Sequence, residues 1–102
     1  MQTFHLYESD KPAKKFYVEF INPDTGRQKK IYFGSSGFQD MRQHKDEERK
    51  KRYINRHKNR EDWDDLTKAG TWSRFLLWAE PTLRDSIKEM NKMFNIKIIK
   101  HK

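Results

Sequence analysis

Apolar and polar residues alternate over much of the first third of the chain, which is the pattern of β-strands with one buried face. In 16–20 (Phe-Tyr-Val-Glu-Phe) the two phenylalanines and the valine share a face, and in 30–33 (Lys-Ile-Tyr-Phe) the isoleucine and the phenylalanine do. Between them, 22–26 (Asn-Pro-Asp-Thr-Gly) supplies residues that tight turns prefer. We therefore predict a β-hairpin, joined by a third strand at 3–7.

A very polar helix is expected after the hairpin. Ser36 and Gln39 match a capping box, in which two side chains satisfy the free backbone donors at a helix start. We predict one long helix that begins at about Phe38 or Asp40 and ends at about Arg60.

Two shorter helices are predicted beyond an acidic connection. Thr71 is expected to cap the first, which runs to about residue 80, and a second with an apolar stripe covers about 82–94. The last residues, 95–102, alternate isoleucine with lysine, so they form either a short strand or a basic arm.

These elements indicate the α+β class. We expect a small antiparallel sheet, built on the N-terminal hairpin and packed with the long basic helix and the two shorter C-terminal helices. Residues 1–94 are predicted to form a single α+β domain, with 95–102 as the C-terminal arm or strand.

Composition excludes several classes of protein for this domain. The chain of 102 residues is only 33% hydrophobic but 14% aromatic, and that aromatic content argues against disorder. It contains no cysteine, which excludes disulfides and thiolate metal sites. The longest apolar run, 75–79, is far shorter than a membrane span, and no signal peptide is expected after Met1.

The formal net charge of +8 is unevenly placed. Residues 41–60 hold nine basic and three acidic residues, and 92–102 hold four lysines and no acid. Arginine suits carboxylate and phosphate because its planar guanidinium can bond two oxygens at once. We predict that an acidic partner or polyanion binds the tail lysines and those basic residues of the helix that have no acid four residues earlier to pair with. These residues are Arg42, Lys45, Arg49, Arg56, Lys58, Arg60, Lys97, Lys100 and Lys102.

Four further residues are predicted to contact a partner. Tyr17 and Tyr32 fall on the outer face of the predicted sheet, where rings beside a lysine either stack nucleic-acid bases or pack against a helix or a neighbouring subunit. Leu77 and Trp78 lie off the apolar stripe of the first short helix, and tryptophan is enriched at interfaces.

No catalytic residue, metal site, cofactor or small-molecule substrate is expected. The histidines do not complete a ligand set, and His57, between Tyr53 and Trp63, is predicted to be packed and hydrogen-bonded. The acidic cluster 61–65 resembles a carboxylate site for Mg²⁺, but acids at a helix start also favour the positive end of its dipole. No nucleophile–base pair or phosphate-binding loop accompanies them.

Two stretches carry a resemblance to a known family. One contains His44-Lys45-Asp46, Arg49-Lys50, Tyr53, Arg56-His57, Arg60-Glu61 and Trp63, and the other contains 69–78 (Ala-Gly-Thr-Trp-Ser-Arg-Phe-Leu-Leu-Trp), Pro81-Thr82-Leu83 and Ser86-Ile87. With the hairpin, they resemble small basic proteins of large double-stranded DNA viruses of the iridovirus-like, chlorovirus-like and mimivirus-like groups. The resemblance covers about Lys15 to Phe94 and implies a viral setting, but supplies no catalytic residues.

The leading hypothesis is a non-enzymatic structural protein of the virion, a minor capsid or cement component. Its basic helix and tail would bind acidic surfaces of capsid or other viral proteins. The alternative is a protein that binds DNA or RNA without sequence specificity and condenses or protects the viral genome. The expected location is the virion, and the host cytoplasm or nucleus during assembly.

Overall fold

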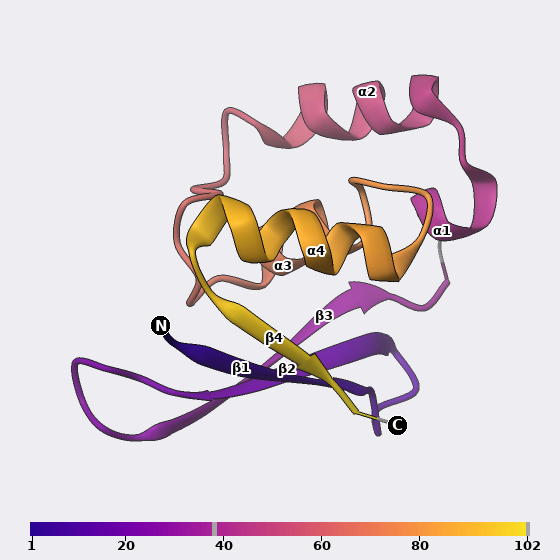
Figure 1. Cartoon of the computed structure of the whole chain (residues 1–102). Coiled ribbons are helices and arrows are strands. Elements are labelled where there is room, and N and C mark those ends of the chain that lie inside the picture. Colours follow the sequence, from indigo (N-terminus) through magenta and orange to yellow (C-terminus); the bar gives the residue numbers. More distant parts are fainter. Residues whose placement is uncertain (38, 102) are drawn as a thin grey trace.

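The computed structural model describes residues 1–37 and 39–101. Three strands are followed by four helices and a final strand (Figure 1). The elements are β1 (Thr3–Glu8), β2 (Lys14–Ile21), β3 (Gln28–Ser35), α1 (Met41–His44), α2 (Glu47–His57), α3 (Ala69–Leu76), α4 (Leu83–Phe94) and β4 (Lys97–Lys100). The α+β class predicted from the sequence is confirmed.

The predicted hairpin and third strand are present. β2 pairs antiparallel with both β3 and β1. In the turn between β2 and β3, the side chain of Asn22 accepts a hydrogen bond from the backbone of Asp24 at 2.9 Å. Gly26 adopts a φ of 71° there, a conformation that glycine takes at no steric cost. The turn therefore forms from the residues that indicated it.

The purely antiparallel sheet that we predicted is wrong, because β4 pairs with β1 in parallel and completes a mixed sheet of order β3-β2-β1-β4. Parallel pairing requires a crossover connection, and α4 precedes β4 directly. The strand interpretation of 95–102 is confirmed for Lys97–Lys100. Lys102 lies outside the described residues.

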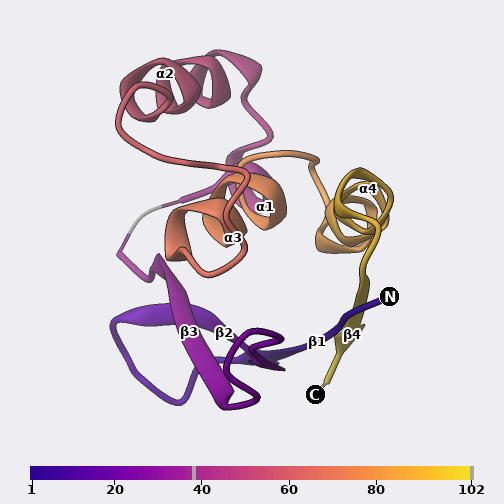
Figure 2. The same ribbon diagram turned by 90° about the vertical axis from the view of Figure 1, so that its left-hand side faces the viewer.

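One face of the sheet and two helices enclose the core. The strand residues Phe4, Leu6, Val18 and Phe33 pack against α3 and α4, and the ring centroids of Phe4 and Trp72 lie 5.0 Å apart. As predicted, the two C-terminal helices cover the apolar sheet face, while none of the described helices lies on the opposite face (Figures 1 and 2).

The single long basic helix is not formed. It is divided into α1 and α2 at Lys45, which has a φ of 52° in the left-handed region. Asp46 then begins a new helix, since its side chain accepts from the backbone N–H groups of Glu48 and Arg49. Phe38, one predicted helix start, lies outside the described residues. α2 does not pack on the sheet: in both views α3 lies between α2 and the strands (Figures 1 and 2).

Two predicted caps are corrected. The capping box belongs to Asp40 and Gln43, while the Ser36 hydroxyl donates to the carbonyl of Pro12 at 2.6 Å. α3 begins before Thr71, whose buried hydroxyl donates to the carbonyl of Asp65 at 2.6 Å. Among the residues described, no helix has the length and apolar character to cross a bilayer.

Candidate functional site

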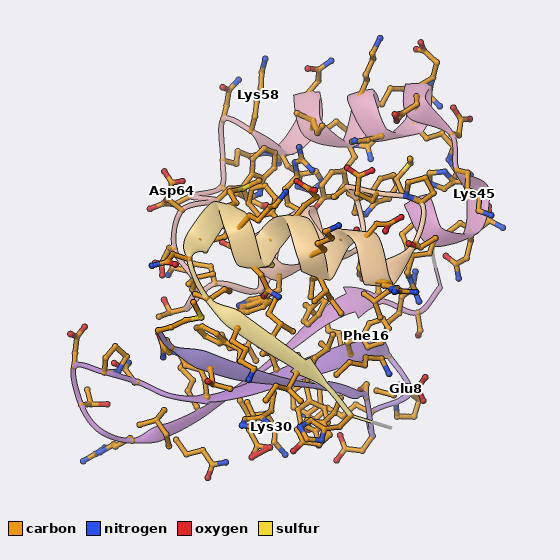
Figure 3. All side chains as sticks on the ribbon, viewed as in Figure 1. Glu8, Phe16, Lys30, Lys45, Lys58 and Asp64 are labelled. Atoms are coloured by element: carbon orange, nitrogen blue, oxygen red, sulfur yellow. The ribbon has the colours of Figure 1, made fainter. Side chains whose placement is uncertain are left out.

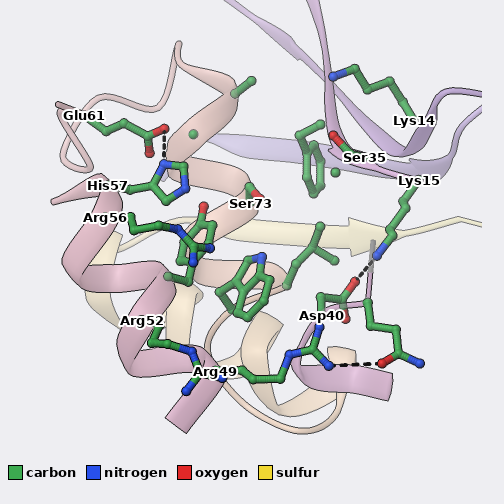
Figure 4. Close-up of a pocket in the computed structure, with 18 residues that line it drawn as sticks. Lys14, Lys15, Ser35, Asp40, Arg49, Arg52, Arg56, His57, Glu61 and Ser73 are labelled. Carbon is green, nitrogen blue, oxygen red and sulfur yellow. Dashed lines mark hydrogen bonds and ion pairs between the residues drawn. The ribbon is translucent and has the colours of Figure 1, made fainter. Parts of the chain in front are cut away.

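A groove of about 490 Å³ lies between α2, α3 and the adjoining ends of β2 and β3 (Figure 4). Five cationic side chains line it, against two carboxylates. The cations are Lys14, Lys15, Arg49, Arg52 and Arg56. We call this hollow the basic groove.

The arginine wall of the basic groove comes from one face of α2. Arg49, Arg52 and Arg56 are separated by three and four residues, so their side chains project from the same side of the helix. Arg49 and Arg56 were predicted as binding residues. Arg52 was left out because an acid, Glu48, stands four residues before it in the sequence. In the described part of the chain no ion pair joins these two side chains. The three-and-four spacing was the signal for Arg52.

Aromatic residues form the floor of the groove and attach α2 to the domain. Tyr53 is 7% exposed and stacks on Trp78, with ring centroids 4.5 Å apart and planes inclined by 4°. Burial raises the pKa of Tyr53, while a hydrogen bond with the side chain of Ser73 acts to lower it. Leu77 was predicted to contact a partner, but it is 1% exposed in the core and is unavailable in this fold. Trp78 is half-buried against α2, because the helix itself covers part of the predicted contact surface.

Asp40 is the buried acid at one end of the groove. Its carboxylate accepts hydrogen bonds from Lys15 Nζ at 2.6 Å and from Arg42 Nε at 3.0 Å. Burial acts to raise the pKa of Asp40, but the hydrogen bonds from Arg42 and Lys15 outweigh it and hold the pKa below its usual value. Arg42 was predicted to bind a partner, but it forms an ion pair with Asp40, two residues earlier. The prediction looked only for acids four residues earlier and therefore missed this pair.

The second groove carboxylate, Glu61, is held beside the start of α3. Its side chain accepts from the indole N–H of Trp63 at 2.7 Å and lies 3.3 Å from His57 Nδ1. A β-carbon at Gly70 would stand 2.6 Å from Glu61 Oε2, so the glycine makes room for the carboxylate. His57 also packs on Tyr53, with ring centroids 4.4 Å apart, which confirms the packed and hydrogen-bonded role predicted for it.

Ser73 also lines the basic groove, near His57 and Glu61 (Figure 4). Its side chain acts to lower the pKa of Tyr53, against the effect of burial.

The remaining predicted cations lie away from the groove. Lys45, Lys58 and Arg60 are exposed; Lys45 lies in the connection between α1 and α2, and Lys58 lies at the end of α2 (Figure 3). Lys97 and Lys100 are exposed on β4, which lies far from α2 in both ribbon views (Figures 1 and 2). The fold therefore separates the basic helix from the basic tail.

Tyr17 and Tyr32 lie on the helix-free face of the sheet. The two residues are register partners, and their ring centroids are 5.1 Å apart. The alternative in which a helix of this chain covers them is excluded, because α3 and α4 lie on the opposite face.

The acidic cluster 61–65 shapes a connection. Asp62 accepts from the backbone of Asp64 at 3.1 Å, and Asp65 accepts from the backbone and hydroxyl of Thr67 at 2.9 and 2.6 Å. These hydrogen bonds from Thr67 lower the pKa of Asp65. The acids therefore stabilise turns before α3, instead of the helix start that we expected. Within residues 1–37 and 39–101, no three histidine, aspartate or glutamate side chains are grouped as metal ligands.

Comparisons with known proteins give one result. Neither the curated proteins nor the solved structures contain a match to this chain. A family model matches residues 4–57, which run from β1 through α2 and include the arginine wall of the basic groove. Since the match spans just over half of the chain, the protein belongs to the family of unknown function DUF5754.

Proposed function

We propose that this protein is a non-enzymatic binding protein whose basic groove holds an acidic segment of a partner protein. The main support for the proposal is that Arg49, Arg52 and Arg56 line one groove together with Lys14. The guanidinium groups supply planar, paired donors that match carboxylates. The lining carboxylates, Asp40 and Glu61, already have hydrogen-bond donors within the chain.

The size and floor of the groove favour a peptide over duplex nucleic acid. A volume of about 490 Å³ accommodates a few side chains, whereas a duplex is far wider than such a hollow. Tyr53 and Trp78 give the floor an apolar character, which suits the aliphatic part of a glutamate side chain.

The biological setting that we propose is the particle of a large double-stranded DNA virus, where the chain serves as a minor capsid or cement component. This setting is supported by the resemblance of the stretches around Tyr53 and 69–78 to small basic viral proteins.

The test compares two charge-reversal variants of equal net charge. The first changes Arg49, Arg52 and Arg56 to Glu, and the matched control changes the exposed Lys51, Lys58 and Arg60, which do not line the groove. Binding of a fluorescent hexaglutamate peptide is measured by anisotropy, with circular dichroism as a check on helix content. We expect the groove variant to lose about 10-fold or more in affinity and the control to lose about 3-fold or less.

Two results would overturn the proposal. Equal losses in both variants would mean that net charge, and not the groove, attracts the peptide. The genome-binding alternative would replace it if an oligothymidylate of equal charge bound more tightly than the peptide and the reversal of Arg49, Arg52 and Arg56 weakened that binding. Its affinity should then fall by about 0.7 log units per neutralised phosphate for each tenfold rise in salt.

A further inference from the structure

The helix-free face of the sheet carries a row of aromatic rings, which we call the aromatic ladder. Tyr32 of β3, Tyr17 of β2, Tyr7 of β1 and His101 follow one another across the strands. The ring centroids are 5.1 Å apart for Tyr32 and Tyr17, 5.0 Å for Tyr17 and Tyr7, and 4.6 Å for Tyr7 and His101. Tyr7 stacks on both Tyr17 and His101, the Tyr32 ring is tilted by 37° against Tyr17, and all four side chains remain partly exposed.

Two lysines are held on this ladder. The ammonium group of Lys11 lies 4.1 Å from the centroid of the Tyr32 ring, and that of Lys30 lies 4.6 Å from the centroid of Tyr17. Lys30 projects on the side of the sheet away from the helices (Figure 3). Because ring faces attract cations, the tyrosines order two flexible side chains before any ligand arrives, which reduces the entropy lost on binding. Two acids lie nearby, and both already have donors within the chain: Asp10 accepts from the hydroxyl of Tyr32 at 2.7 Å, and Glu19, the register partner of Lys30, accepts from the side-chain amide of Gln28.

A second hollow lies beside the other end of the ladder. It has a volume of about 520 Å³ and adjoins Tyr7 and His101. Polar side chains with donors and acceptors line it, among them His5, Gln28 and Glu19. It therefore combines ring surface with hydrogen-bonding groups, as sites for planar heterocycles do.

We propose that the helix-free sheet face binds single-stranded nucleic acid, with phosphates on Lys11 and Lys30 and a base in the hollow beside Tyr7 and His101. The strands of Tyr32 and Tyr7 are two strand spacings apart, about 10 Å, so the face spans a short stretch of nucleotides. The pairing of ring surface with ammonium groups suits bases and phosphates, which favours this occupant over a second copy of the chain. This surface is distinct from the basic groove, which lies on the helix side of the sheet.

Binding is tested on the full chain with a 15-nucleotide oligothymidylate. Amide chemical shifts are followed by NMR during the titration, and a Lys11→Glu, Lys30→Glu variant retains every ring of the ladder. The matched control reverses Lys51 and Lys58, which are exposed on and just after α2. We expect shifts centred on Tyr7, Tyr17, Lys30 and His101, and an affinity loss of about 10-fold in the first variant and about 3-fold or less in the control.

Three outcomes would overturn this proposal. Shift changes confined to α2 and the basic groove would place the oligonucleotide elsewhere. Equal losses in the two variants would show that only net charge matters. Inorganic polyphosphate of the same charge binding as tightly, with the same shifts at Tyr7 and His101, would show that the hollow receives no base.

Discussion

Tyr53 of α2 and Trp78, which follows α3, stack with ring centroids 4.5 Å apart and planes inclined by only 4°. This contact fixes a helix whose other faces are strongly polar, since Tyr53 is its buried residue. The stack also forms the floor of the basic groove, so one contact both attaches the arginine wall and places it opposite Lys14.

Removal of the Tyr53 ring is expected to release α2. Tyr53→Ala should lower the free energy of unfolding by about 3 kcal/mol, because a buried aromatic side chain and its stacking partner are lost. Tyr53→Phe keeps the stack and removes only the hydroxyl, so it should cost no more than about 1 kcal/mol. Urea denaturation measures both values, and amide hydrogen exchange should show α2 opening in the alanine variant. A loss below about 1 kcal/mol for Tyr53→Ala would contradict this role.

Among the described acidic residues, Asp40 is expected to be the one whose replacement lowers stability most. Asp40→Asn should lower stability by about 2–4 kcal/mol, because the ammonium group of Lys15, with its side chain only 11% exposed, loses its counter-charge. Asp24→Asn, in the exposed turn after β2, is the matched control and should change stability by less than about 0.5 kcal/mol.

The contribution of Asp40 should also depend on pH. Its pKa is lowered in the fold, so its stabilisation is fully present above the ordinary value of 3.8 and is lost as pH falls through the lower folded value. The stability difference between the native protein and Asp40→Asn should stay constant from neutral pH to about pH 5 and shrink below pH 3.8. Denaturation curves at a series of pH values measure it, and a gap that widens in acid would show the opposite shift.

His44 should make the fold less stable in mild acid. Burial, together with the charge of Arg49, lowers the pKa of His44 below 6.5, and its Nδ1 accepts from the backbone of Asp46 at 2.9 Å. The neutral ring is therefore the form that fits the fold, and its Nε2 is buried without a partner in the described structure. Since the unfolded chain takes up the proton more readily, stability should fall as pH drops below 6.5.

The His44 expectation is checked directly by NMR titration of its ring, with a midpoint below 6.5 as the predicted result. His44→Phe keeps a ring against Trp78, whose centroid lies 5.2 Å from that of His44, and removes the proton site. Its stability should fall less than that of the native protein between pH 7 and 5. Parallel pH dependence in the two proteins would assign the effect to other groups.

Gly34 is expected to tolerate no side chain. Its φ is 79°, and a β-carbon there would stand 2.6 Å from Leu77 Cδ1 in the core. Gly34→Ala should lower stability by about 2–4 kcal/mol through backbone strain and overpacking. Gly37→Ala is the control, because no atom lies within 4 Å of its β-carbon position. Thermal unfolding of both variants tests this, and similar midpoints would contradict it.

The sequence alone predicted the parts of the fold that depend on local periodicity. The alternation around Tyr17 and Tyr32 identified both strands and their faces, because successive side chains of a strand point to opposite sides. The turn at 22–26 was predicted from residues that tight turns prefer, and the two C-terminal helices were predicted from apolar residues at helical spacing. The break at Lys45 was missed although the residue after it, Asp46, is a strong N-cap, since the helical charge pattern runs through it.

Tertiary structure decided which charged residues act together. Arg42 is used by Asp40, Arg52 joins the groove, and Lys97 lies on a distant strand, although all are equally cationic in the sequence. Periodicity gives the side of an element on which a residue lies, but not which other element faces that side. That pairing depends on long-range packing, here the parallel addition of β4 and the stacking of Tyr53 on Trp78, and neither contact leaves a local pattern in the chain.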